Sequence, residues 1–169
     1  MGLSSPLQTA FTIPHNKLLR KTAMTAVDIP LQFEQVVQAY ESANVDCQIA
    51  ILWQTYDTLG QAFAAIAPVA LFSQAVQQLI NQMQQVGRDD QVSILCDIVA
   101  GADTRFAHAY QALNTNMKLA FWHRLFAYLP VSRLPLSTCQ QVPVTRALLT
   151  RLDAMGLNER LHFLRRVVG

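Results

Sequence analysis

The chain has 169 residues, of which 51 % are hydrophobic and 14 % are charged, and its formal net charge is +2. Average soluble domains carry about 25 % charged residues, so this chain holds more apolar side chain than a domain of its size needs. No run approaches the roughly 18 uncharged apolar residues of a membrane span, which favours a soluble, non-spanning protein of one domain.

The first 30 residues predict an extended arm. Pro6, Pro14 and Pro30 interrupt this stretch, which leaves room for one short helix near residues 16–24. The stretch also lacks the basic, apolar and small-residue order of a secretory signal. We therefore expect an N-terminal arm over residues 1–30 and a single helical domain over residues 31–169.

Helical periodicity begins at Leu31, and Phe33, Val36 and Tyr40 share one face of the first predicted helix. Asn44 is a good N-cap for the second helix, which is expected to fray at Gly60 and to end at Pro68. Further helices are expected over residues 71–86, 90–100, 104–113, 115–128, 144–155 and 158–168. Runs of alternating β-branched residues hardly occur, so the fold class is all-α.

Local signals mark the ends of these later helices. Gly87, Gly101 and Gly156 each follow a periodic segment and are typical helix terminators. Asp103 is the expected N-cap of the helix over residues 104–113. Residues 130–143 begin and end with proline and predict a connection between helices.

The three cysteines, Cys47, Cys96 and Cys139, have no metal-type spacing and are odd in number. This pattern suits a reducing interior better than a secreted disulfide framework, and it favours a cytoplasmic protein. Cys96 lies in an apolar helical segment, where an inert thiol is favoured over a nucleophile.

No motif for catalysis, metal binding or nucleotide binding is present. The sequence has no Gly-x-Ser-x-Gly motif and no Gly-rich loop before a helix. The four histidines are far apart, and none forms a Glu-x-x-His pair that would build a metal site in a helical bundle. The sequence therefore predicts no catalytic residues and no metal.

Positive charge gathers at both ends of the chain. Residues 1–30 contain three basic residues against one acidic residue, and residues 129–169 contain six arginines against two acidic residues. Such polarity either orients the protein against an acidic partner or reflects the solvated ends of a helical bundle. A nucleic-acid partner is not expected, because the arginines lack interleaved exposed aromatic residues.

Residues 116–130, "NMKLAFWHRLFAYLP", predict a helix that is apolar on nearly every side. Such a helix is buried or lies beside another apolar group. Trp122 is at its centre, and Trp53 and Tyr56, three residues apart on an earlier helix, share one face. Spacing alone favours these three aromatic residues as core.

Four segments resemble the helical carotenoid proteins, which are homologues of the N-terminal domain of the orange carotenoid protein of cyanobacteria. The segments are "DCQIAILWQTYDTLG", "AIAPVA", "ILCDIVAGADTRFAHAY" and "NMKLAFWHRLFAYLP". The resemblance implies an all-α fold of two interleaved four-helix bundles, with one ketocarotenoid, such as canthaxanthin or echinenone, in a tunnel between them. It also implies that this chain lacks the C-terminal domain of the orange carotenoid protein.

By this resemblance Trp53, Tyr56 and Trp122 clamp the carotenoid. The residues that line the tunnel by the same resemblance are Ile49, Leu52, Leu95, Cys96, Leu119, His123, Leu134 and Pro135. Asn116 and Arg165 match family positions near the tunnel mouth, and Arg166 joins them as a candidate partner contact.

The sequence departs from the family pattern at three positions. His123 and Leu95 stand where many members have tyrosine and methionine, and Thr138 falls near the position of another tunnel tyrosine. A histidine in the tunnel could add pH sensitivity, or could simply form a hydrogen bond at the helix surface.

The expected function is non-enzymatic carotenoid binding for photoprotection, by quenching of singlet oxygen. A small homologue of the orange carotenoid protein's C-terminal domain is the expected pigment donor. One alternative is a module that docks on the phycobilisome, the thylakoid-bound antenna, through Arg165 and Arg166 and quenches its excitation. The other alternative is a pigment-free helical scaffold.

Overall fold

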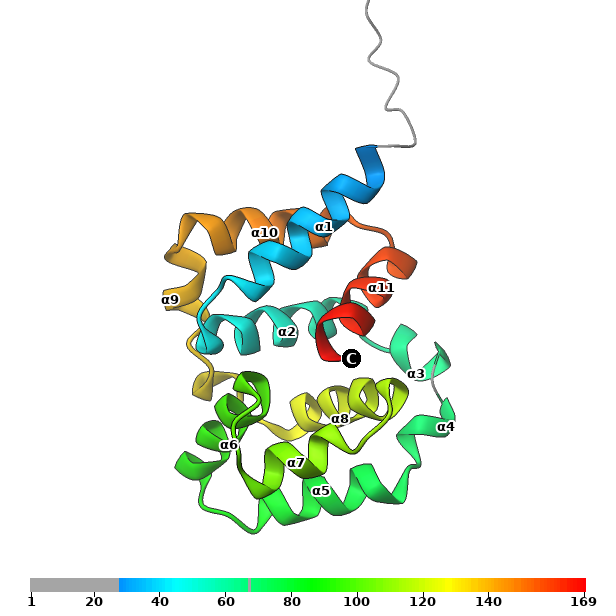
Figure 1. Cartoon of the computed structure of the whole chain (residues 1–169), viewed down its shortest axis with the longest axis vertical. Helices are drawn as coiled ribbons and strands as arrows, with labels where there is room; N and C mark the ends of the chain where they lie inside the picture. The colour runs from blue at the N-terminus through cyan, green and yellow to red at the C-terminus, as the bar shows by residue number, and fades with distance from the viewer. Residues whose placement is uncertain (1–27, 67) are drawn as a thin grey trace, which may run out of the picture.

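The computed structural model describes residues 28–66 and 68–169, and within these ranges the regular structure is helical, without a strand (Figure 1). The helices, in chain order, are α1 (Asp28–Glu41), α2 (Val45–Leu59), α3 (Ala62–Ile66), α4 (Pro68–Leu71), α5 (Gln74–Gln84), α6 (Arg88–Ala100), α7 (Arg105–Gln111), α8 (Thr115–Tyr128), the 3₁₀ turn η1 (Val131–Arg133), α9 (Leu136–Gln141), α10 (Pro143–Ala154) and α11 (Leu157–Val168). The predicted all-α class is confirmed.

The helices form two groups that share a boundary. In the first group α1 packs on α10 and α11, and α10 packs on α2 and α9. In the second group α5 and α4 pack on α8, and α6 packs on α5 and α7. Helix α2 packs on both α6 and α8, and α11 also packs on α8, so the groups interlock as expected for two interleaved bundles (Figure 1).

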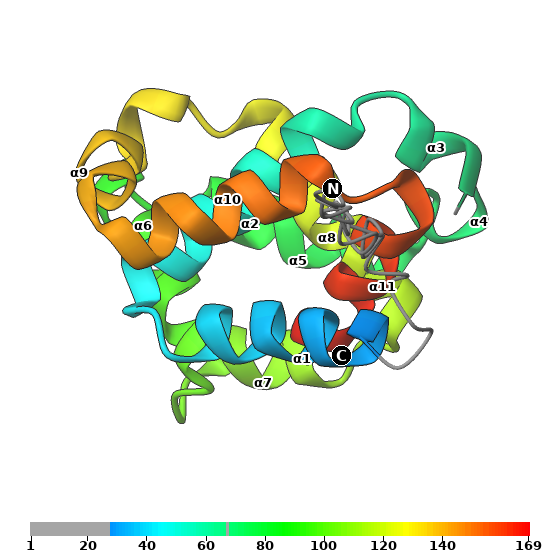
Figure 2. The ribbon, with the colours of Figure 1, turned by 90° about the horizontal axis from the view of Figure 1, so that it is seen from above.

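One hydrophobic cluster runs through both groups and includes residues from α1, α2, α5, α6, α7, α8, α10 and α11. Because α2 and α8 contribute to it from opposite sides of the boundary, the centre of the core lies where the two groups meet. Both views place α9 at one end of the molecule and α3 and α4 at the other (Figures 1 and 2).

The start of α2 follows the sequence prediction, but the helix ends at Leu59 and not at Pro68. The Asn44 side chain accepts a hydrogen bond from the Cys47 backbone N–H at 2.8 Å, which satisfies one of the free N–H groups in the first turn. Gly60 ends the helix at φ 51°, a conformation that glycine adopts without steric cost.

The helix expected over residues 71–86 is present as α5, but it begins at Gln74 and not at Leu71. Pro68 begins the short helix α4 instead of ending the preceding helix, and Phe72 and Ser73 separate α4 from α5. The Ser73 side chain then caps α5 by accepting a hydrogen bond from the Val76 N–H. The Leu71 carbonyl oxygen, released from the helix, accepts a hydrogen bond from Arg124 of α8 at 2.9 Å.

Two later boundaries also differ. Thr104 caps α7, with its hydroxyl accepting from the Ala107 N–H at 3.4 Å, whereas the carboxylate of Asp103, the expected cap, pairs with His108 at 2.9 Å. The expected connection over residues 130–143 contains η1 and α9.

Helix α1 begins at Asp28, ahead of the expected start at Leu31, and the short helix expected near residues 16–24 lies outside the described residues.

A disulfide joins Cys47 of α2 to Cys139 of α9, with the two Cα atoms 5.4 Å apart and both side chains buried. The two cysteines are 92 residues apart, so their proximity is a product of the fold that spacing does not reveal. This finding removes the argument that the odd cysteine number favours a reducing interior. Cys96 is free and half-buried.

Among the described residues, every helix is too short or too polar to cross a membrane. Within the same residues, His, Cys, Asp and Glu side chains nowhere gather in threes in a way that could hold a metal ion.

Candidate functional site

Trp122 lies at the centre of the boundary between the two helical groups, and its side chain is 1 % exposed. Its ring packs against Phe121 and Phe126, each with a centroid 5.4 Å away. The Trp122 Nε1–H donates to the Tyr110 hydroxyl at 2.9 Å, and that hydroxyl donates to the Val168 carbonyl oxygen at 3.2 Å. The buried indole therefore has the partner that a buried tryptophan requires.

Tyr56 and His123 form the other part of this aromatic cluster. The Tyr56 hydroxyl donates to the Leu119 carbonyl oxygen at 3.0 Å, which ties α2 to α8. The Phe63 ring packs between them, with its centroid 5.6 Å from that of Tyr56 and 4.7 Å from that of His123. Burial raises the pKa of Tyr56 well above its ordinary value and lowers that of His123, so both side chains are held neutral.

Most of the side chains predicted to contact a ligand meet in the main hydrophobic cluster. The buried members are Ile49, Leu52, Tyr56, Leu95, Leu119, Trp122 and Leu134. Trp53 and Cys96 are half-buried and pack against the cluster. His123 is half-buried within the aromatic part, and Pro135 is half-buried where it precedes α9.

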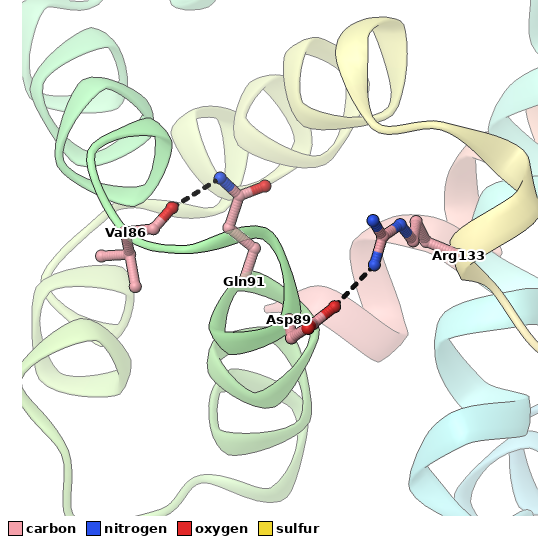
Figure 3. Close-up of polar contacts among 4 residues, drawn as sticks. All are labelled: Val86, Asp89, Gln91 and Arg133. Carbon is pink, nitrogen blue, oxygen red and sulfur yellow. Dashed lines mark hydrogen bonds and ion pairs between the residues drawn. The ribbon is translucent and has the colours of Figure 1, made fainter.

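Leu134 follows a residue that forms a surface ion pair with α6. Figure 3 shows the Arg133 guanidinium on the Asp89 carboxylate at the start of α6, at 2.6 Å. In the same region the Gln91 side chain donates to the Val86 carbonyl oxygen at 3.1 Å and connects α6 to the end of α5. The ion pair connects η1 to α6, and the Leu134 side chain that follows is buried in the main hydrophobic cluster.

Two cavities lie beside the aromatic cluster. One of about 260 Å³ is lined by Leu52 and Trp122 together with polar residues from α1, α2, α7 and α8. The other, of about 570 Å³, is lined by His123, Arg124 and the start of α5. Phe72, which is 85 % exposed, lies at the edge of the second cavity. The cluster is therefore bordered by open space on the Trp122 side and on the His123 side.

The three residues considered for partner binding, Asn116, Arg165 and Arg166, are all exposed. Asn116 lies in the first turn of α8, and the two arginines lie in the last turn of α11. The two helices pack on each other, so the three side chains come from adjoining elements.

Sequence reasoning missed three aromatic members of the site. Tyr110, Phe63 and Phe126 contact Trp122, Tyr56 or His123, and none of them was assigned a role. The size of Trp122 signalled that its ring N–H needs a partner, but Tyr110 lies on a different helix, where helical spacing cannot find it.

A family model described as "Orange carotenoid protein, N-terminal" matches residues 27–169. A Nostoc protein described as an orange carotenoid-binding domain-containing protein is 27 % identical over 136 residues, which cover 79 % of each chain. The orange carotenoid-binding protein of Synechocystis is 27 % identical over 115 residues, which cover 68 % of this chain and 35 % of that protein. The chain thus spans about a third of the length of the Synechocystis relative.

Solved structures with the same fold come from Anabaena (Nostoc). Its orange carotenoid protein binding canthaxanthin superposes with a TM-score of 0.68 and 20 % identity, covering 81 % of this chain and 45 % of that one. Its red carotenoid protein binding canthaxanthin superposes with a TM-score of 0.64 and 21 % identity, covering 81 % of this chain and 95 % of that one.

Proposed function

The chain belongs to the family of the N-terminal domain of the orange carotenoid protein, and from this premise we propose that it binds one carotenoid, without enzymatic activity, for photoprotection. The finer proposal is a ketocarotenoid such as canthaxanthin or echinenone, with singlet oxygen as the species that is quenched. The bound pigment supplies the quenching chemistry, and the protein binds, orients and shields it.

One observation carries the proposal: the side chains expected around the ligand meet in one apolar cluster at the boundary of the two helical groups, with a cavity on either side. The chemistry of this cluster fits a polyene. Trp122 Nε1 and the hydroxyls of Tyr56 and Tyr110 form hydrogen bonds within the protein. These atoms therefore need no hydrogen-bond partner on the ligand, which suits a ligand with almost no polar atoms.

In this proposal Trp53, Tyr56 and Trp122 hold the pigment. The side chains that line its path are Ile49, Leu52, Leu95, Cys96, Leu119, His123, Leu134 and Pro135. An elongated ligand that reaches from the Trp122 cavity to the His123 cavity requires the side chains between them to move apart. Burial of apolar ligand surface at roughly 25 cal/mol per Å² drives that opening.

Colour tests the proposal directly. The full chain, expressed in a host that makes ketocarotenoids, should purify as an orange to red protein that shortens the lifetime of singlet oxygen, measured by its infrared emission. A colourless protein with all pigment left in the host membranes would support the pigment-free scaffold instead. Colour without a change in singlet-oxygen lifetime would retain binding and reject the quenching role.

Substitution of Trp122 by alanine tests its place in the site. We expect Trp122→Ala to lower pigment yield and shift the absorption maximum, because the variant removes the largest buried ring of the cluster. Loss of a buried tryptophan also costs about 3–5 kcal/mol of stability, so the folded fraction is measured by circular dichroism and the yield is expressed per folded protein. An unchanged spectrum and yield would exclude Trp122 from the pigment contact.

A second role, docking on the phycobilisome, is favoured by the exposure of Arg165 and Arg166 at the end of α11. Their positive charge would face acidic antenna surfaces, and docking would place the protein beside the thylakoid membrane. The pigmented protein should then lower antenna fluorescence at low salt and lose this effect at high salt. Unchanged fluorescence at low salt would reject docking while leaving pigment binding intact.

A small homologue of the orange carotenoid protein's C-terminal domain is proposed as the pigment donor.

A further inference from the structure

Helix α9 is joined to α2 by the disulfide between Cys47 and Cys139. The helix has six residues, all of them described, and Cys139 is the one among them that is buried. Around the disulfide the buried side chains of Cys47, Ala50 and Cys139 form a small cluster apart from the main hydrophobic cluster. Because such small side chains bury little apolar surface, packing alone holds α9 weakly on α2.

The other contacts between α9 and α2 are also weak. Leu136 is half-buried and borders both clusters. The exposed Gln140 side chain donates to the Gln54 side-chain oxygen at 3.3 Å, and a hydrogen bond in water contributes little net stability. Helix α9 packs on α10 as well, but α10 follows it in the chain after a single residue, Val142. The disulfide is therefore the strongest link that fixes α9 to α2.

Helix α2 carries the disulfide and part of the candidate site on two adjoining faces. Cys47, Ala50 and Gln54 are spaced by three and four residues and share the face toward α9. Ile49 and Leu52 lie on the next face and are buried in the main hydrophobic cluster. The position of α9 on α2 is thus set one helix face away from the expected ligand.

The segment directly before α9 also contributes to the candidate site. Leu134 is buried in the main hydrophobic cluster, and Pro135 immediately precedes the first turn of α9. On the other side of Leu134, the Arg133 guanidinium is paired with Asp89 of α6. Movement of α9 away from α2 therefore displaces Pro135 and Leu134 and opens the site at this end, with the η1 ion pair as the fixed point.

We propose that the disulfide between Cys47 and Cys139 is a redox clasp that controls the exchange of ligand at the α9 end of the candidate site. In the oxidised protein α9 is fixed on α2 and the ligand is retained. In the reduced protein α9 separates from α2 in local opening events, and ligand enters and leaves. The inference rests on the proposed function for its ligand, whereas the effect of the disulfide on α9 is independent of that function.

Reduction of the clasp requires a dithiol, which is a small molecule or protein with two neighbouring thiols. One thiolate of the dithiol attacks the Cys139 sulfur, forms a mixed disulfide and releases Cys47 as a thiolate that takes up a proton. The second thiolate of the dithiol attacks its own sulfur partner in the mixed disulfide and releases Cys139, which is protonated in turn. The protein gains two thiols, and the dithiol becomes a disulfide.

Access to the sulfur atoms depends on local opening of α9. Both cysteines of the disulfide are buried, so a dithiol reaches them only when α9 moves. A six-residue helix is too short to be stable by itself, and short elements with few buried contacts open more readily than the core. Reduction and opening therefore assist each other at the same place.

The third cysteine does not compete for the clasp. Cys96 lies on α6, and its Sγ donates to the Asp46 carboxylate at 3.6 Å. Burial, and then the Asp46 carboxylate, raise the pKa of this thiol above its ordinary value. Because the thiolate is the nucleophile in disulfide exchange, Cys96 does not displace Cys47 or Cys139 from their bond.

The first experiment uses the full chain without ligand. Thiol titration of the denatured protein should find one free thiol before reduction by dithiothreitol and three after it. Hydrogen–deuterium exchange in α9 should then become about tenfold faster or more, which corresponds to roughly 1.4 kcal/mol in the free energy of opening, with a smaller change in α5. Three free thiols before reduction, unchanged exchange in α9, or an equal rise in α5 would each overturn the inference.

The second experiment measures release of the ligand. Wild-type protein loaded with canthaxanthin is mixed with an excess of empty phosphatidylcholine vesicles, and the pigment left on the protein is followed by absorption. Reduction should raise the release rate by about tenfold or more, and reoxidation should restore the slow rate. Cys139→Ser should release pigment rapidly with or without dithiothreitol. Ser137→Ala, which changes an exposed residue of α9 and keeps the disulfide, is the matched control and should respond like the wild-type protein.

The wild-type comparison stands without the variants, because the same chain is measured in its two redox states. Equal release rates from the oxidised and reduced wild-type protein would overturn the inference, as would an effect of dithiothreitol on Cys139→Ser. Failure of the wild-type protein to bind canthaxanthin in either state would instead overturn the proposed function. Faster hydrogen exchange in α9 after reduction would in that case still retain redox control of the helix.

Discussion

Tyr110 makes the buried hydrogen bonds that connect Trp122 to the neighbouring helices. Its hydroxyl accepts from the Trp122 indole and donates to Val168, and its ring lies beside the Lys118 ammonium. One phenol therefore connects α7 with α8 and α11 inside the core. Burial raises its pKa well above the ordinary value of tyrosine, so it remains a neutral donor across the physiological range.

Removal of the Tyr110 hydroxyl should destabilise the fold. In Tyr110→Phe the buried Trp122 Nε1–H and the Val168 carbonyl each lose their partner, at a cost of about 1–3 kcal/mol, which urea unfolding would measure. Tyr128→Phe is the control, because the buried Tyr128 hydroxyl has no hydrogen-bond partner among the described residues and its loss leaves nothing unpaired. Equal losses in the two variants would show that the Tyr110 hydroxyl contributes no net stability.

His123 makes stability depend on pH in a defined direction. Burial lowers its pKa below the ordinary value of 6.5, so the unfolded chain binds a proton more readily than the folded protein. Stability is full above about pH 6.5, falls as the pH drops through that value, and levels off below the lowered pKa of the folded state.

His123→Phe removes this titration and keeps an apolar ring beside Phe63. Between pH 7 and pH 5 the variant should lose less unfolding free energy than the wild-type protein, as followed by urea unfolding at each pH. The other histidines are common to both proteins, so the difference isolates His123. Parallel pH curves for the two proteins would contradict a lowered His123 pKa.

At the scale of elements, the disulfide connects α2, which carries Tyr56, to α9, which follows η1 and Leu134. Closing a long loop limits the unfolded chain, so Cys139→Ser should lower the unfolding free energy by about 2–4 kcal/mol without reductant. Cys96→Ser is the matched control, because Cys96 is not part of the disulfide. In excess dithiothreitol the Cys139→Ser variant and the wild-type protein should have the same unfolding free energy. A lower unfolding free energy of Cys139→Ser under these conditions would show that packing, and not the covalent bond, is responsible.

Element boundaries followed the sequence where the chain carries its own stop signals. Helix α8 has the predicted bounds because its apolar run is limited by Asn114 before it and Pro130 after it. Helix α11 begins at Leu157, directly after Gly156, which is the boundary signal on its N-terminal side. The break at Phe72 and Ser73 carried one local signal that the sequence prediction did not use, because serine is a favoured N-cap and Ser73 caps α5. The hydrogen bond from Arg124 to the Leu71 carbonyl comes from a distant element and has no local signal.

At the scale of the whole molecule, the candidate site lies where the two helical groups meet, and its members come from helices that are distant in sequence. Spacing placed Trp53 and Tyr56 on one face, but it favoured a core role for them and for Trp122; the ligand interpretation came from the resemblance. Neither the contact of Tyr110 with Trp122 nor the burial of Lys118 could be read from local pattern, because both depend on how α7, α8 and α11 pack. Local periodicity therefore predicted the helices, and only tertiary packing defines the site.

The disulfide also gives the chain a topology of one ring with two tails. Residues 47–139, which include α5 to α8, form the ring, and the exposed Phe72 lies within it. Phe72 directly follows α4, and Figure 1 shows α4 on the opposite side of the molecule from α9, the helix that contains Cys139. A single chymotrypsin cut after Phe72 opens the ring without separating its two parts. The nicked protein should run as one band in denaturing gels without reductant and release a fragment beginning at Ser73 once reductant is added. Release of that fragment without reductant would show that the ring is not closed. With the ring closed, cleavage at this surface loop breaks one peptide bond and leaves every helix attached to the molecule.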